Sequence, residues 1–333
     1  MAQSYRKERI SVAFLLDNLR GAVGAEVEVS VEGQPAERYV REDVLHRPGL
    51  VLAGYIDLFT HERVQVLGNT EIRFLQHLTP EKRQEAVRQL MQFEVPCVFV
   101  TSGNAVPAEL IQAAQTANVP VYSTPEPSVD FMQKLRDFLR DQFAQQKTVH
   151  ASLIDVYGVG IMLMGKAGIG KSEIALDLVE RGHRLVADDV VIATRKGNVV
   201  MGAGTELGQH FMEIRGLGLV DVRAMFGIRA IRFQKRVELV VDLHLWDPDE
   251  EYTRLGMIEG YYSLLGLDLP VVKLPIVPGK NITVICEVIA MNYLLQHYGY
   301  DAAEIFAHRL SEQIKKNSNG PGRGVEYFES DTE

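Results

Sequence analysis

The run GKAGIGKS at residues 165–172 is the feature that most constrains what this chain can fold into. It matches the pattern G-x-x-x-x-G-K-[ST], in which a strand leads into a glycine-rich turn and then a helix. The N–H groups of such a turn converge on phosphate oxygens, and the helix adds its positive end. An apolar strand-like run, IDVYGVGIMLMG, precedes the turn, and an amphipathic run, SEIALDLVERG, follows it. We therefore predict an ATP phosphate cradle here.

The polar residues of the cradle are of types that bind phosphate and magnesium. Lys171 would place a point charge against the β and γ phosphates, and the Ser172 hydroxyl would complete the shell of a magnesium ion. The alternative is an ordinary glycine-rich turn between strand and helix, without a ligand. The residues predicted to bind the nucleotide are Gly165, Lys166, Ala167, Gly168, Ile169, Gly170, Lys171 and Ser172.

Two acids interrupt the apolar run LVADDVVIA, 17 and 18 residues after Lys171. If this strand lies beside the cradle strand, its carboxyl end brings Asp188, Asp189 or both toward the γ phosphate. There they could hold the metal or accept a hydroxyl proton. Adjacent strand residues point to opposite faces, so we expect separate roles unless a bulge or strand end re-aims one acid. The alternative is a strand that ends early, with both acids solvated.

Four further residues are candidates. His150 lies 15 residues before Gly165, at the entrance of the cradle strand, and Glu213 in EIRGLGLVDVRAMFG could be a second magnesium ligand. Arg254 in YTRLG and Lys280 in PIVPGKN are loop cations suited to stabilising a transferring phosphoryl group. For all four the alternative is an ordinary solvated surface residue.

The length of 333 residues allows about two domains. In the first part, the runs LVLAG, VQVLG, CVFVT and VPVYST read as strands that alternate with helices, one of them opened by Pro80. We predict an amino-terminal α/β domain with a mainly parallel sheet over residues 1–147. The polar run QQKTV marks the boundary.

The sequence pattern of residues 148–315 predicts a mixed α/β domain with antiparallel elements. HRLVADDVVIA and VELVVDLHLW are predicted strands, and RKGN a hairpin turn. Two helices follow, one from about Asn281 and one opened by the capping pair Asp301 and Glu304. The polar residues 316–333 are expected to form a disordered tail.

Composition excludes several functions. The net charge of -9 argues against a general grip on nucleic acid, which needs cationic groups. Cys97 and Cys286 lie in apolar runs and are expected to be buried thiols. The amino-terminal run lacks a cleavage site, and no stretch approaches about 18 apolar residues, so we expect a cytoplasmic protein without membrane association.

The run from HASLIDVYGVGIMLMGKAGIGKS to GHRLVADD, followed by EIRGLGLVDVRAMFG, resembles the catalytic domain of HPr kinase/phosphorylase. The similarity continues through TRLG, PIVPGKN and AMNYLLQHYGYDA, and so covers about residues 148–310. RPGLVLAGYIDLF and RVQVLGNTE resemble the amino-terminal domain of that family. The resemblance implies a P-loop kinase domain similar to the nucleotide-binding core of phosphoenolpyruvate carboxykinase, in a homohexamer.

The resemblance also implies a bifunctional enzyme. Such enzymes phosphorylate a serine of the phosphocarrier protein HPr with ATP or pyrophosphate, and remove that phosphate with inorganic phosphate, releasing pyrophosphate. By resemblance, Lys171 binds phosphate, Ser172 and Glu213 coordinate Mg²⁺, and Asp189 is the base for serine attack and the acid in reverse. Asp188, His150 and Arg254 match positions that assist catalysis.

The resemblance also implies roles for two longer segments of this chain. The segment implied in both reactions comprises Glu213, Ile214, Arg215, Gly216, Leu217, Gly218, Leu219, Val220 and Asp221. The segment implied in phosphorolysis comprises Pro275, Ile276, Val277, Pro278, Gly279 and Lys280. The family usually has Arg at the last position, and Lys280 keeps the charge but loses the planar fork that grips phosphate. Lys166 and Ala167 stand where Asp and Ser are frequent.

Two other functions fit parts of the pattern. One is a small-molecule enzyme on the same core, resembling phosphoenolpyruvate carboxykinase or a metabolite kinase, which would need a closed polar pocket. The other is a nucleotide-sensing interaction protein that has lost catalysis, for which the acid and metal-binding groups would be absent. Ser172, Asp189 and Glu213 are present.

Overall fold

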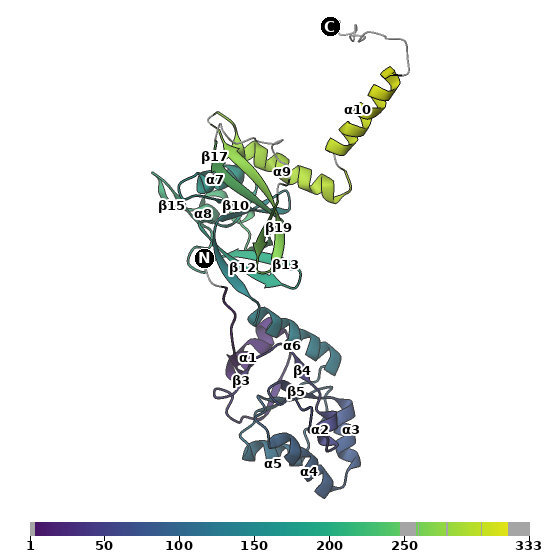
Figure 1. Cartoon of the computed structure of the whole chain (residues 1–333). Helices are drawn as coiled ribbons and strands as arrows, with labels where there is room; N and C mark the ends of the chain where they lie inside the picture. The colour runs from purple at the N-terminus through teal and green to yellow at the C-terminus, as the bar shows by residue number, and fades with distance from the viewer. Residues whose placement is uncertain (1–3, 247–257, 259, 278, 301, 319–333) are drawn as a thin grey trace. The chain divides into compact units, whose positions relative to one another are not determined.

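The computed structural model describes residues 4–246, 258, 260–277, 279–300 and 302–318 (Figure 1). The chain divides into two compact units. The first comprises residues 1–148 and 193–200, and the second residues 149–192 and 201–333. Each unit has its own sheet and its own buried core.

The first unit is built on a five-stranded sheet in the order β2-β7-β6-β5-β4. Three pairs in it are parallel and β2 joins antiparallel, so the predicted mainly parallel sheet is confirmed. A short antiparallel pair, β1 and β3, lies apart from this sheet. The strands are β1 Ile10–Ser11, β2 Glu28–Val31, β3 Tyr39–Val40, β4 Leu45–His46, β5 Val64–Leu67, β6 Val98–Val100 and β7 Val121–Ser123.

Helices of the first unit form two cores with this sheet. One core contains residues of α1, η1 and α6, and the other residues of α2, α3, α4 and α5. An apolar stripe at four-residue spacing, formed by Phe131, Leu135, Leu139 and Phe143, is buried in the former. The helices are α1 Val12–Asn18, η1 Leu19–Val23, α2 Gly49–Leu52, α3 Asn69–His77, α4 Pro80–Met91, α5 Ala108–Thr116 and α6 Ser128–Gln142.

One predicted strand of this unit is wrong. The run LVLAG forms the helical turn α2, with Pro48 at its amino-terminal cap. Val51 and Leu52 are buried while Leu50 is exposed, a pattern that suits one side of a turn. Proline restricts its own φ to values compatible with a helix start, and a four-residue apolar run is too short for its period to be read.

The main sheet of the second unit has six strands in the order β11-β9-β10-β17-β19-β18. β10, β17 and β19 are mutually parallel, and the other pairs are antiparallel, as expected for a mixed domain. The strands are β9 Ser152–Val156, β10 Val159–Gly165, β11 Arg184–Ala187, β17 Leu239–Leu245, β18 Gly260–Leu264 and β19 Leu267–Ile276. The predicted single strand before the cradle is in fact the hairpin β9–β10, because Tyr157 and Gly158 turn the chain with positive φ.

The predicted strand HRLVADDVVIA is also divided. β11 ends at Ala187 and β12 begins at Val190, and the two strands belong to different sheets. Asp189 has a φ of 60°, which a continuous strand cannot contain. β12 lies in a four-stranded sheet of order β16-β13-β12-β8, with the predicted RKGN turn between β12 and β13. Its strands are β8 Gln146–His150, β12 Val190–Lys196, β13 Val199–Gly204 and β16 Gln234–Arg236.

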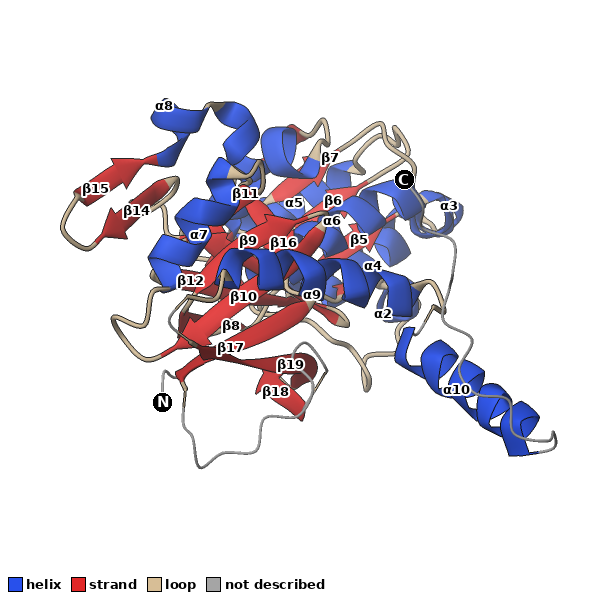
Figure 2. Cartoon of the chain, turned by 90° about the horizontal axis from the view of Figure 1, so that it is seen from above, coloured by secondary structure: helices blue, strands red, loops and turns tan. Residues whose placement is uncertain are grey.

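A two-stranded hairpin and several helices complete the second unit. The hairpin consists of β14 Phe211–Ile214 and β15 Gly218–Asp221 and leads into α8 (Figure 2). α7 and α9 pack against each other and against β10. The helices are α7 Lys171–Glu180, α8 Val222–Phe226, η2 Ile228–Ala230, α9 Ile282–His297 and α10 Ala302–Ser318.

The prediction for the start of one carboxyl-terminal helix is confirmed. Asn281 caps α9, its side chain accepting a hydrogen bond from the Val284 N–H at 3.2 Å. Asp301 of the other predicted capping pair lies outside the described residues. α10 continues to Ser318, three residues into the predicted disordered tail, and residues 319–333 are not described. No helix in the described ranges is both long and apolar enough to span a bilayer.

A buried ion cluster joins α7 to α9. Glu287 of α9 is 5% exposed and receives two hydrogen bonds from the Arg181 guanidinium, at 3.0 and 2.6 Å. The His183 ring lies 2.9 Å from the same carboxylate. Hydrogen bonds from Arg181 lower the pKa of Glu287, and His183 contributes in the same direction. The cluster fixes the carboxyl end of the cradle helix to α9.

We expect Glu287→Gln to lower the free energy of unfolding of the second unit by about 1–3 kcal/mol, because it removes the charged acceptor of the buried His183 and the half-exposed Arg181. Since the pKa of Glu287 is depressed on folding, its contribution is present above the unfolded value of about 4.3 and is lost as the pH falls through the folded value. The gap between wild type and variant in the free energy of unfolding, measured by urea denaturation, should therefore stay constant from pH 7 to about pH 4.3 and narrow as the pH falls further. Glu180→Gln, an exposed change on α7, is the control. A gap independent of pH would contradict the ionic origin.

Candidate functional site

Three glycines give the cradle its backbone path. Gly165 ends β10 with a φ of 142°, and Gly168 and Gly170 have φ values of 75° and 103°. A Cβ atom at Gly165 would lie 2.6 Å from the Leu243 carbonyl oxygen on the neighbouring strand. Conformation and space thus both favour glycine at that position. The structure places the predicted turn between β10 and α7 as expected from the sequence.

The Lys171 side chain folds back over the turn. Its Nζ donates to the carbonyl oxygens of Gly165 at 3.2 Å and Lys166 at 3.3 Å. Both acceptors are main-chain groups of the cradle, so the ammonium group lies within the turn itself.

The acid pair reaches the cradle by a different path from the one predicted. β11 does not lie beside β10, because β9 is between them and pairs antiparallel with both. Two antiparallel steps restore the direction, so β11 runs as β10 does and ends at the same edge of the sheet. The turn after β11 then carries Asp188 and Asp189 toward the start of α7.

The two acids have different surroundings. Asp188 accepts a hydrogen bond of 2.5 Å from the Ser152 hydroxyl and lies near the hydroxyl of Ser172. Asp189 is exposed, and its left-handed backbone turns it away from the path of the strand. A strand end that re-aims one of the two side chains is the exception to the rule that adjacent strand residues point to opposite faces, so separate roles do not follow from strand geometry and stay a prediction.

Burial raises the pKa of the Asp188 carboxyl, while hydrogen bonds from Ser152 and Ser172 act in the opposite direction. Its second oxygen, Oδ2, is buried and meets no hydrogen-bond donor among the residues that the structure describes. A buried carboxylate oxygen without a donor is suited to a hard cation or a ligand proton. Together with the Ser172 hydroxyl, it offers oxygen ligands of the type that Mg²⁺ prefers.

His150 lies beside the acid pair along the backbone. It ends β8 with an exposed side chain, and the N–H of the next residue, Ala151, donates to the Asp189 carbonyl oxygen at 3.2 Å. The sequence predicted a place at the entrance of the cradle strand. The structure puts His150 next to the turn that carries Asp189.

The segment 213–221 forms the hairpin of β14 and β15. β14 packs against α7, so the exposed Glu213 is on an element that contacts the cradle helix. Gly216 and Gly218 have positive φ values of 85° and 91° and shape the turn of the hairpin. Within the described ranges, no three His, Cys, Asp or Glu side chains converge as a metal cluster.

The segment 275–280 comprises the last two residues of β19 and the loop after it. β19 is parallel to β17 and β17 to β10, and the register aligns Gly165 with Leu243 and Leu243 with Leu274. The chain leaves the sheet after Ile276, two residues beyond Leu274, at the edge where the cradle begins. The Lys280 N–H donates to the Val277 carbonyl at 3.2 Å, which closes this loop. Pro278 and Arg254 lie outside the described residues.

Two contacts were not predicted from the sequence. Ser152 is fully buried and donates to Asp188, and Arg215 lies with its guanidinium against Gly168 of the cradle. A serine in β9, all of whose residues are buried, is a detectable signal for the first contact. The contact between Arg215 and Gly168 depends on how the hairpin folds, and no local sequence pattern predicts it.

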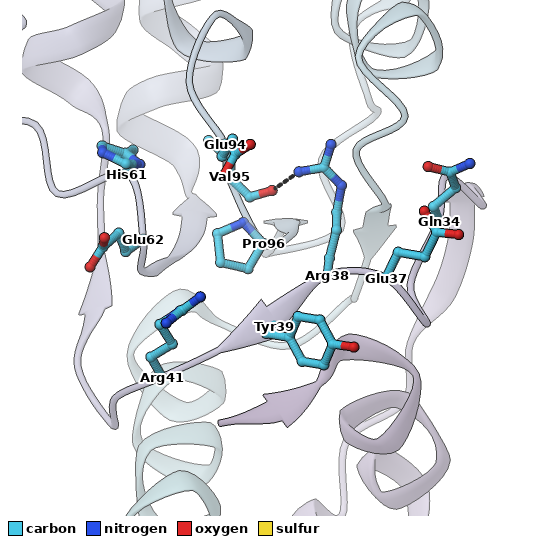
Figure 3. Close-up of a pocket in the computed structure, with 10 residues that line it drawn as sticks. All are labelled: Gln34, Glu37, Arg38, Tyr39, Arg41, His61, Glu62, Glu94, Val95 and Pro96. Atoms are coloured by element: carbon cyan, nitrogen blue, oxygen red, sulfur yellow. Dashed lines mark hydrogen bonds between the residues drawn. The ribbon is translucent and has the colours of Figure 1, made fainter. Parts of the chain in front are cut away.

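The first unit contains a pocket of about 290 Å³ (Figure 3). Arg38 lines it and donates to the carbonyl oxygens of Val95, Ala117 and Asn118 at 2.5, 2.7 and 2.9 Å. Its guanidinium thus ties main-chain segments together, and we assign the residue a structural role.

Comparison with known proteins agrees with this architecture. The family model described as HPr Serine kinase N terminus matches residues 10–139, and the one described as HPr Serine kinase C-terminal domain matches residues 141–310. The HPr kinase/phosphorylase of Chloroherpeton thalassium is 51% identical over 332 residues, covering 98% of each chain. That of Prosthecochloris aestuarii is 50% identical over 331 residues, covering 98% of this chain and 97% of its own.

A solved structure, the Hpr(Ser) kinase/phosphatase from Coxiella burnetii, is 31% identical and covers 48% of this chain and 97% of its own, with a TM-score of 0.44. The family matches and the full-length relatives define an enzyme with a nucleotide-binding kinase domain. The chain belongs to the HPr kinase/phosphorylase family.

We expect Gly165→Ala to weaken ATP binding at least 10-fold, because the new Cβ would collide with the Leu243 carbonyl and α7 would have to shift. Isothermal titration calorimetry measures the affinity, and a thermal melt reports whether the fold survives. Gly260→Ala is the matched control, since a Cβ there meets nothing within 4 Å. ATP affinity unchanged in the Gly165 variant would contradict the assignment of the cradle.

Proposed function

We propose that this chain transfers a phosphoryl group from ATP to a serine of HPr and removes it by phosphorolysis with inorganic phosphate, releasing pyrophosphate. The relatives that it matches over almost their full length are named HPr kinase/phosphorylase. The observation that carries the proposal is the meeting of Asp188 and Asp189 with the head of the cradle helix at one edge of the sheet.

The cradle supplies binding and charge neutralisation. The N–H groups of the turn and Lys171 would hold the phosphates of ATP, or of pyrophosphate as an alternative donor. Ser172, Asp188 and Glu213 would hold Mg²⁺, which when bound neutralises charge on the transferring group. Phosphoryl transfer needs mainly alignment and charge neutralisation, and these residues account for both.

Asp189 is the residue we assign to the proton. Its exposed side chain can be reached by a serine hydroxyl of a docked protein, whereas Asp188 is held by Ser152. As the serine oxygen bonds to the γ phosphorus, the bond to the β-phosphate oxygen breaks and Asp189 takes the hydroxyl proton. In reverse, a phosphate oxygen attacks the phosphoserine, pyrophosphate forms and Asp189 returns the proton to the serine oxygen.

His150 and Arg254 are proposed to assist both directions, and Lys280 to face the incoming phosphate. By resemblance to the family, we also propose a homohexamer that acts in the cytoplasm. The direct test of function is transfer of labelled phosphate from ATP to purified HPr of the same organism, with the modified residue mapped by mass spectrometry. Label in a metabolite but not in HPr would instead indicate a small-molecule kinase.

Asp189→Asn should reduce phosphoryl transfer at least 100-fold in both directions while MgATP still binds, because the carboxylate manages a proton and adds little affinity. HPr labelling, pyrophosphate release and calorimetric titration give the three quantities. Asp268→Asn changes an exposed acid of β19 in the same unit and should leave all three unchanged. Near-normal rates in the Asp189 variant would refute its role.

Lys280→Ala should slow phosphorolysis more than phosphorylation, since the proposed partner of Lys280 is the attacking phosphate. Lys280→Arg should lower the KM for phosphate, because a planar fork can bind it bidentately. Initial rates in both directions, at varied phosphate, separate the two effects. Equal losses in the two assays would count against a specific role in phosphorolysis.

A further inference from the structure

The pocket of the first unit is built from three segments that are far apart in the sequence. Residues 34–41 include β3, residues 61–62 precede β5, and residues 94–96 follow α4 (Figure 3). Its volume of about 290 Å³ is at the small end of pockets that hold small molecules. None of its lining residues belongs to the proposed site of phosphoryl transfer. The pocket therefore has no part in the mechanism described above.

Five charged side chains line this pocket without pairing. Two are guanidinium groups and three are carboxylates, from Arg38, Arg41, Glu37, Glu62 and Glu94. In the part of the chain that the structure describes, no ion pair joins any of the five to another residue. Elsewhere in the same unit charges do pair, as Arg47 does with Glu71 at 2.7 Å. Opposite charges held apart around a cavity are complementary to a molecule that carries both signs.

Arg38 supplies a cation whose position is fixed. Through its hydrogen bonds to the carbonyl oxygens of Val95, Ala117 and Asn118, it uses three of the five N–H donors of a guanidinium. Burial lowers the pKa of Arg38 and the nearby charge of Glu94 raises it, and an arginine in a protein stays charged at neutral pH. A guanidinium that is already held in place loses less side-chain entropy when it binds a carboxylate.

Arg41 and His61 are two further lining residues with unused hydrogen-bonding groups. Arg41 is exposed, and Figure 3 shows its guanidinium directed toward Pro96. Within the described ranges its side chain makes no hydrogen bond. The half-buried His61 ring stacks on Phe93 with 5.5 Å between the ring centroids, and its Nδ1 is buried with no hydrogen-bond partner among the described residues. A polar ligand in the pocket would relieve the cost of such an atom.

The charges of the lining also restrict the class of ligand. A purely anionic ligand would meet three carboxylates, and a purely cationic ligand would meet two guanidinium groups, so each would bring like charges together. The small volume favours a ligand whose positive and negative groups lie only a few bonds apart. An α-amino acid has this charge distribution.

We propose that this pocket binds a free α-amino acid. The ligand's carboxylate accepts hydrogen bonds from Arg38 and Arg41, and its ammonium group donates to the glutamate carboxylates of the lining. No bond is made or broken in the pocket. The first unit thereby has a function of its own, the recognition of a small metabolite, and the inference does not depend on the proposed function.

The first test is calorimetric titration of the full chain with each standard α-amino acid at pH 7. We expect at least one to bind with a Kd below about 1 mM. The methyl ester of that amino acid lacks the carboxylate charge, and its N-acetyl derivative lacks the ammonium group. Each derivative should bind about 10-fold or more weakly than the parent. No binding by any amino acid, or a derivative that binds as tightly as its parent, would overturn the proposal.

Variants of Arg41 test whether the ligand occupies this pocket. Arg41→Ala should weaken binding about 10-fold or more, and Arg41→Lys should recover only part of the affinity because an ammonium group cannot replace the planar fork. Arg136→Ala changes an exposed arginine of α6 and should bind as wild type does. Because Arg41 is exposed, the melting temperature of Arg41→Ala should stay within about 2 °C of wild type. Unchanged affinity in Arg41→Ala would refute the assignment of the pocket.

The carboxylates are tested one at a time. Glu37→Gln, Glu62→Gln and Glu94→Gln remove a charge while keeping the size of the side chain, and at least one should weaken binding about 10-fold. Glu26→Gln, an exposed change in the same unit, is the control and should leave the affinity unchanged. Wild-type affinity in all three lining variants would refute recognition of the ammonium group.

Discussion

The parallel pairing of β10 with β17, and of β17 with β19, is the constraint on which the candidate site depends. It aligns Gly165 with Leu243 and Leu243 with Leu274, so the loops that follow β10 and β19 leave one edge of the sheet together. The pairing is also close enough to exclude a side chain at Gly165. A cradle built mainly from main-chain groups therefore takes its position from the sheet, and side chains of neighbouring elements only complete it.

The antiparallel strand β9 has a second function in this arrangement. It separates β11 from β10, and it also carries Ser152, which donates to Asp188. Burial of a carboxylate is unfavourable unless hydrogen bonds or a cation compensate it, and one oxygen of Asp188 still has no donor among the described residues. The fold thus places the Asp188 carboxylate next to the Ser172 hydroxyl, at the first turn of α7, and a cation at this position would stabilise the buried oxygen of Asp188.

Much of the fold could be predicted from local sequence, and the errors share one cause. The glycine spacing of the cradle and the apolar stripe of α6 are period and turn signals that local residues determine. The turn at Tyr157 and Gly158, the helix at Gly49–Leu52 and the break at Asp189 lie within apolar runs, where periodicity does not mark a change of direction. The sequence-based prediction placed Asp188 near the cradle by assuming that its strand lies directly beside the cradle strand. In the structure β9 lies between β11 and β10 and is antiparallel to both. β11 therefore still ends at the same edge of the sheet as β10, so the location was right although the strand order was wrong.

The contact between Arg215 and Gly168 shows what a motif leaves out. A glycine at this position of the cradle is commonly attributed to its φ value alone, and 75° does require that freedom. Here the missing side chain has a second consequence, since it leaves space for a guanidinium that comes from more than 40 residues further along the chain. The cradle pattern is local in the sequence, whereas the hairpin, which has no such pattern, places a guanidinium beside the turn.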